Sequence, residues 1–138
     1  MKTEYDIAEE IFNSGDYIKA FQFFKNITEN LLSSDEDKSD AFLMMGVIVL
    51  IDSRVENDDE SGLNYFKESL KFNPYNIGSL FNIIEGFGLS INCHKNIEML
   101  DYAIKNLEEI KYNFTETEKN MINHKIILKE NILNESPS

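Results

Sequence analysis

The sequence predicts an all-α fold built from helical hairpins. Apolar residues recur at spacings of three and four along most of the 138-residue chain, as in helices with one buried face. Only two prolines and six glycines interrupt this pattern, which disfavours a strand-and-turn protein. In addition, a pattern of a small, a bulky and a second small residue recurs, and this spacing suits antiparallel helices that cross closely.

The recurring pattern indicates a helical-hairpin solenoid, because its second and third copies lie 34 residues apart. The first instance is the stretch with Gly15, Tyr17, Ala20 and Phe24. It recurs in degenerate form at Gly62, Phe66 and Ser69, and at Asn96, Leu100 and Ala103. The chain resembles the tetratricopeptide repeat family over roughly residues 2–111. This resemblance implies a right-handed superhelix of three hairpins whose first helices line a concave, protein-binding groove.

Seven helices are predicted, and the first six pair into hairpins over about residues 2–32, 38–72 and 76–111. Gly15 can adopt the left-handed conformation that ends the first helix, and Asp16 can cap the second. The apolar stripe of the second helix extends to Leu31, and the polar run 33–39 separates it from the third. The seven helices cover about residues 2–13, 16–32, 38–53, 59–72, 76–89, 94–111 and 116–134.

The end of the fourth helix and the start of the seventh have clear sequence signals. The fourth helix should stop before Asn73, because the residue before Pro74 avoids helical angles. Thr115 and Glu118 form a capping box at the start of the seventh helix. We expect this helix to cover the open end of the third hairpin, since a terminal repeat otherwise exposes its packing face. Residues 1–134 would then form a single domain with a frayed tail at 135–138.

Charge is concentrated in the first part of the chain. Residues 1–60 carry fifteen acids and five bases, a net charge of −10, whereas residues 61–138 have a net charge of −2. Such a field repels nucleic acid and anionic membranes and attracts a basic protein. Partner contacts are therefore expected at the acidic clusters, through Asp35, Asp37, Asp58 and Asp59. The alternative is that the acidity serves only to keep the chain soluble.

No membrane insertion is expected, because the longest apolar run, residues 41–51, is too short to span a bilayer. The first residues lack the apolar stretch of a secretory leader, so we expect a cytoplasmic location. The helix over 38–53 is apolar on nearly every face. It is therefore either the buried middle of a small superhelix or part of a hydrophobic groove open to a partner.

The family pattern implies which side chains line the groove. The first helices of the three hairpins would contribute an apolar trough with acidic spots. On that pattern the groove includes Tyr5, Glu9 and Phe12, then Leu43, Val47 and Leu50, and finally Phe81 and Glu85.

The sequence contains little that suggests catalysis. Cys93 and His94 are adjacent, but neighbouring residues rarely point at one substrate atom, and no third group orients the histidine. His124 adds no recognisable metal-ligand spacing, and the acidic clusters lack the alternating ligands and glycine of a calcium loop. We expect no catalytic site, no metal and no cofactor.

The sequence favours a non-enzymatic protein-interaction module with an apolar, acid-rimmed groove. Two roles fit a small acidic module: an immunity or antitoxin-like inhibitor of a basic toxin, and a secretion-type chaperone that shields an amphipathic segment. A different class is a structural subunit of a larger assembly. An enzyme built around Cys93 and His94 is the least favoured alternative.

Overall fold

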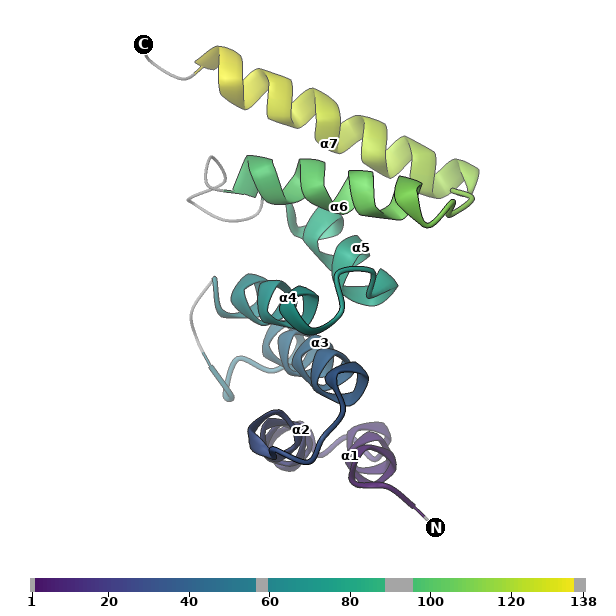
Figure 1. Ribbon diagram of the computed structural model, residues 1–138. Helices are drawn as coiled ribbons and strands as arrows, with labels where there is room; N and C mark the ends of the chain where they lie inside the picture. Colours follow the sequence, from purple (N-terminus) through teal and green to yellow (C-terminus); the bar gives the residue numbers. More distant parts are fainter. Residues whose placement is uncertain (1, 57–59, 89–95, 136–138) are drawn as a thin grey trace. The chain divides into compact units, whose positions relative to one another are not determined.

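The computed structural model describes residues 2–56, 60–88 and 96–135, which form seven α-helices and contain no strand (Figure 1). The predicted all-α class is confirmed. The chain divides into two compact units, unit 1 (Met1–Ser79) and unit 2 (Leu80–Ser138), and each is described by itself. The helices are α1 (Glu4–Asn13), α2 (Tyr17–Glu29), α3 (Asp35–Ile51), α4 (Ser61–Phe72), α5 (Ile77–Gly86), α6 (Ile97–Glu109) and α7 (Glu116–Glu135).

Several helix ends form where the sequence predicted them. Gly15 has a φ of +91°, and Asp16 accepts a hydrogen bond from the Lys19 backbone N–H at 3.1 Å. The Thr115 hydroxyl and the Glu118 carboxylate each accept the other residue's backbone N–H, at 3.1 and 2.9 Å. These bonds satisfy amide groups that have no partner within the helix. The predicted caps of α2 and α7 are confirmed.

The end of α2 differs from the prediction. The helix stops at Glu29, so Leu31 lies outside it and is 93% exposed, and its assignment to a buried stripe was wrong. Asn30 causes the stop, because its backbone is extended and its side-chain oxygen accepts the Leu32 N–H at 2.9 Å. Asparagine makes such local bonds readily, and they compete with helix continuation.

The start of α3 also differs. It begins at Asp35 instead of residue 38, because the Ser34 hydroxyl accepts the Asp37 N–H at 3.1 Å and caps the helix. The acids expected in a loop therefore occupy the first turn of α3. Their negative charge is favourable there, beside the positive end of the helix dipole.

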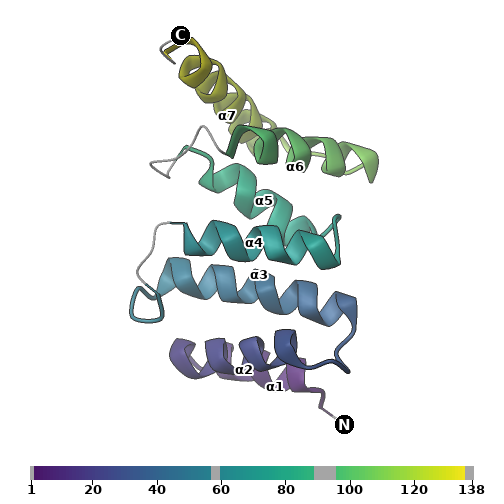
Figure 2. The same ribbon diagram turned by 60° about the vertical axis from the view of Figure 1, so that its left-hand side comes forward.

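In unit 1, α3 packs against α2 on one side and α4 on the other, while α1 packs against α2 (Figure 2). This explains why α3 is apolar on nearly every face. Ala41, Met45 and Ile48 at its centre are at most 2% exposed, whereas Leu50 and Ile51 at its end are 64% and 52% exposed. From residue 41 to residue 49, every side chain of α3 is therefore buried or half-buried.

The α3–α4 contact is very close. A Cβ atom placed on Gly46 of α3 would lie 2.5 Å from Cε1 of Phe66 on α4. Glycine is needed here for space, because the ring of a buried phenylalanine has little freedom to move. The bulky and small positions of the recurring pattern are buried in all three copies, at Ala20, Phe24, Phe66, Ser69, Leu100 and Ala103.

A buried hydroxyl network continues this contact. The Ser39 hydroxyl lies 3.0 Å from that of Ser69, which accepts a hydrogen bond from Ser79 at 2.6 Å. The Asn76 amide donates to Ser39 and to the Asp40 carboxylate, both at 2.9 Å. The three serines are fully buried, and these bonds satisfy hydroxyl groups that would be costly to bury alone.

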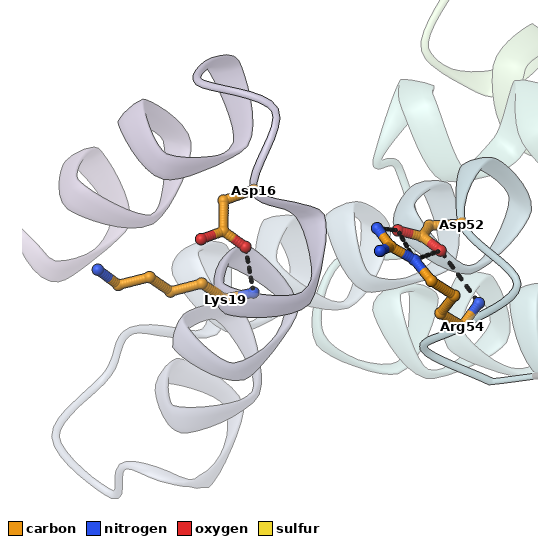
Figure 3. A network of polar contacts seen from close by, with 4 residues as sticks. All are labelled: Asp16, Lys19, Asp52 and Arg54. Atoms are coloured by element: carbon orange, nitrogen blue, oxygen red, sulfur yellow. Dashed lines mark hydrogen bonds and ion pairs between the residues drawn. The ribbon is translucent and has the colours of Figure 1, made fainter.

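Asp52 and Arg54 form an ion pair directly after α3 (Figure 3). Asp52 follows the helix and accepts hydrogen bonds from the backbone and the guanidinium of Arg54, the shortest at 2.6 Å. These bonds lower the pKa of Asp52. The same bonds and the charge of Asp52 raise the pKa of Arg54, with a smaller contribution from Asp16. The one arginine of the chain is thus held locally.

In unit 2, side chains of α7 contact α6 and the residues that follow α5. Ile122 of α7 is 6% exposed, and Lys125 donates to the Phe87 carbonyl at 3.1 Å. Lys129 pairs with Asp101 of α6 at 2.8 Å. The Leu128 side chain of α7 packs closely against the left-handed Gly88, where an added Cβ atom would require that leucine to move. α7 therefore covers apolar parts of unit 2.

We expect Gly46→Ala to destabilise the protein. Overpacking against Phe66 should cost about 1–3 kcal/mol and outweigh the roughly 0.5–1 kcal/mol that alanine gains in a helix. Gly86→Ala is the matched control, because nothing lies within 4 Å of its added Cβ. Urea unfolding followed by circular dichroism measures both. Equal stability of the two variants would show that the α3–α4 crossing has room.

We expect truncation after Asn113 to expose apolar surface of unit 2, since α7 is removed. The truncated chain should aggregate or lose part of its cooperative melt, as measured by light scattering and circular dichroism. A monomeric truncated chain with an unchanged melting temperature would contradict the packing role of α7.

Candidate functional site

Four side chains of unit 1 lie near enough to interact electrostatically, and we call them the acidic face: Tyr5 and Glu9 of α1, and Asp37 and Asp40 of α3. Glu9 lies one turn after Tyr5, and Asp40 lies one turn after Asp37, so each pair shares one side of its helix. Tyr5 is half-buried, and its ring meets that of Phe24 edge to face at 5.5 Å. This packing fixes the tyrosine beside the carboxylates of α3.

The pKa values of Tyr5 and Asp40 are raised mainly by burial, and neighbouring charges add to both shifts. Burial raises the pKa of Tyr5 to about 12, and the charges of Asp40, Glu9 and Asp37 add to the shift. Burial also raises the pKa of Asp40, and the Glu36 and Asp37 charges act in the same direction, while the bond from Asn76 opposes them. Both shifts have the cause expected for groups in a partly desolvated negative field.

Three cations of unit 1 are engaged in other contacts. Lys2 pairs with Glu10, and Lys38 lies 5.6 Å from the centre of the Phe72 ring. Arg54 is held by Asp52. Residues 1–79 carry sixteen acids against seven bases, so the potential around the acidic face is negative and a cationic partner group can neutralise it.

A depression of about 200 Å³ adjoins the acidic face, and we call it the corner pocket. Tyr5 and Asp37 belong to both features. Ile27 is 2% exposed and forms an apolar floor, whereas Leu32 is 93% exposed and stands at the border. The full lining is Glu4, Tyr5, Ile27, Asn30, Leu32, Ser33 and Asp37. The pocket thus combines an apolar base with two carboxylates.

The predicted groove residues of unit 1 divide into two groups. Tyr5, Glu9 and Asp37 come together on the acidic face, and Asp35 is exposed in the same first turn of α3. The others serve packing at least in part. Phe12 is half-buried, and its ring centre lies 5.3 Å from that of Tyr17. Leu43 packs against Gly78, and Val47 is half-buried. Leu50 is exposed and contacts Gly62.

The remaining predicted site residues lie in unit 2 or outside the described ranges. Glu85 is exposed on α5, whereas Phe81 is half-buried with its ring centre 5.3 Å from Tyr112 and 6.4 Å from Phe114. Asp58 and Asp59 lie outside the described residues, as do Cys93 and His94.

Two contributors to the site were missed from the sequence. Asp40 was not selected, although its position three residues after Asp37 places it on the same side of a helix. Leu32 was assigned to a helix. The sequence signal that could have placed Leu32 outside the helix is Asn30, because asparagine often ends helices and two leucines and a polar run follow it here.

Three serines in the core of unit 1 are not accessible as nucleophiles. Ser39, Ser69 and Ser79 are fully buried and bonded to one another, so they present no accessible nucleophile. Within residues 2–56, 60–88 and 96–135, no three His, Cys, Asp or Glu side chains are grouped to hold a metal ion. Across the same ranges, none of the helices combines the length and the apolar character needed to cross a bilayer.

No protein-family model, curated protein or solved structure matches the chain. The likeness to the tetratricopeptide repeat family, with its right-handed superhelix, therefore stays a prediction from the residue pattern.

The shifted pKa of Tyr5 predicts a loss of stability at high pH. Tyr5 keeps its proton to about pH 12 in the folded protein, whereas an unfolded chain releases it near pH 10. The unfolded state therefore binds fewer protons over this interval, and the free energy of unfolding should fall as the pH rises through it. Tyr5→Phe should lose less stability over the same interval, as measured by urea unfolding at a series of pH values.

Absorbance titration of tyrosinate isolates the group itself. The difference between the wild type and Tyr5→Phe should titrate near pH 12, and Asp40→Asn should lower that midpoint without restoring it to 10, because burial is the larger cause. A midpoint near pH 10 in the wild type would contradict the burial of Tyr5.

Proposed function

We propose that the chain is a non-catalytic protein-binding module that engages a basic partner through unit 1. The observation that supports this most directly is the convergence of Tyr5, Glu9, Asp37 and Asp40 from two helices onto one face. A cationic segment placed there neutralises several carboxylates at once. It also recovers the unfavourable energy of holding them in a partly buried negative field.

The electrostatics favour fast and selective encounter. Residues 1–79 carry sixteen acids and seven bases, so the field around unit 1 extends beyond the acidic face. Such a field raises the association rate for a partner of opposite charge and suppresses encounters with anionic surfaces, including nucleic acid. Short-range contacts with Tyr5 and the neighbouring apolar groups then slow dissociation.

Within this class, inhibition of a basic protein, as in an immunity or antitoxin-like role, is the function that the acidic face supports best. An inhibitor of this kind needs a rigid, charged surface more than it needs reactive groups. A secretion-type chaperone is the second candidate, supported by the exposed leucines near the corner pocket, which suit an amphipathic client. A structural subunit of a larger assembly would use the same surface permanently.

The test uses a partner co-purified with the tagged chain and measures its association rate over a series of salt concentrations. We expect the triple variant Glu9→Gln, Asp37→Asn, Asp40→Asn to lower the on-rate about tenfold at low salt, with a smaller effect on the off-rate. Glu98→Gln, Glu108→Gln, Glu130→Gln is the matched control, since it removes three exposed carboxylates from unit 2.

Two results would overturn the proposal. One is a partner with a net negative charge at the contact surface. The other is an on-rate that is indifferent both to salt and to the unit 1 variant, because the acidity would then have no part in recognition.

A further inference from the structure

Leu31 and Leu32 are the most exposed large apolar side chains that the structure describes, each at 93%. They lie side by side in the turn between α2 and α3. The turn is ordered by its own bonds, since Asn30 accepts the Leu32 N–H and the Ser33 N–H donates to the Asn30 carbonyl at 3.1 Å. Two leucines held in water by a defined turn are unfavourable unless another surface covers them.

The leucines adjoin a site for a cation. Leu32 lines the corner pocket, where Glu4 and Asp37 supply carboxylates and Ile27 forms the base. The Tyr5 ring lies on the same lining. A lysine or arginine fits this combination, because its carbon stem packs on apolar groups while its charged end reaches the carboxylates. A volume of about 200 Å³ suits one such side chain.

We infer that this corner docks a basic amphipathic helix of a partner protein. One cationic side chain of that helix enters the corner pocket, and its apolar face covers Leu31 and Leu32. The inference rests on the proposed function and specifies the partner segment that the acidic unit recognises. Charge complementarity selects this occupant. A second copy of unit 1 would bring its own excess of nine negative charges, and an anionic membrane would be repelled in the same way.

The probe is a synthetic 14-residue helix with leucines along one face and lysines elsewhere. Two control peptides accompany it: one has the same composition with the leucines distributed around the helix, and the other has glutamate in place of lysine. Isotope-labelled full-length protein is titrated with each peptide, and amide chemical shifts map the contact. We expect the amphipathic basic peptide to shift the amides of Tyr5, Leu31, Leu32 and Ser33, and the control peptides to bind at least about tenfold more weakly.

Variants test the two halves of the corner separately. Leu31→Ser with Leu32→Ser should raise the Kd of the basic peptide about tenfold or more, since the variant lacks the apolar surface that the peptide buries. Glu4→Gln with Asp37→Asn should raise the Kd and reduce its salt dependence. Ile127→Ser is the matched apolar control, because Ile127 is 56% exposed on α7 of unit 2, and it should leave the Kd unchanged. Circular dichroism melts check that each variant folds.

The outcomes separate the inference from the proposed function. If the basic peptide binds, but its shifts lie away from residues 30–33 or the leucine variant binds equally well, the inference is overturned and the proposed function stands. If neither basic peptide binds at millimolar concentration, both are overturned. If sedimentation experiments show that the wild-type chain is a dimer and that Leu31→Ser with Leu32→Ser dissociates it, the corner is a contact between copies and the inference is overturned.

Discussion

The close approach of α3 and α4 constrains the rest of unit 1. Gly46 leaves space for the Phe66 ring, and Ser39 and Ser69 bring their hydroxyls within 3.0 Å, so small residues stand at both levels of the crossing. α3 is enclosed between α4 and α2, and its exposed residues lie at its two ends. Close packing of this kind has little tolerance for volume changes, which makes the position of α3 well defined.

The acidic face follows from that position. The first turn of α3 is capped by Ser34 and brings the half-buried Asp37 near Tyr5 of α1, while Asp35 and Glu36 are exposed. The buried network also reaches this face, because the Asn76 amide bonds both Ser39 in the core and Asp40 at the surface. A carboxylate held by the core keeps one geometry, and a preorganised binding group loses less conformational entropy when a partner arrives.

The corner between α2 and α3 adds an apolar component to a surface that is otherwise charged. Electrostatic attraction acts over a distance of about a Debye length, roughly 8–10 Å in physiological salt, and guides encounter. Burial of side chains such as Leu31 and Leu32 acts only on contact and determines how long a complex lasts. A surface with both properties discriminates between partners better than one with charge alone, because a partner must match in sign and in shape.

The sequence by itself determined the helices and several of their ends. Apolar periodicity and local caps depend on neighbours three or four residues away, so Asp16, Thr115 and the stop before Asn73 were readable from the chain. It did not determine that Asn30 would end α2 early, because its side-chain bond competes with a helix that was also compatible with the pattern.

Only the tertiary structure decided that Tyr5 and Asp40 share one face, and that Ser39, Ser69 and Ser79 meet in the core. Those contacts join residues 10 to 35 positions apart, and their geometry depends on how α1, α3, α4 and the start of α5 pack, which no local pattern encodes.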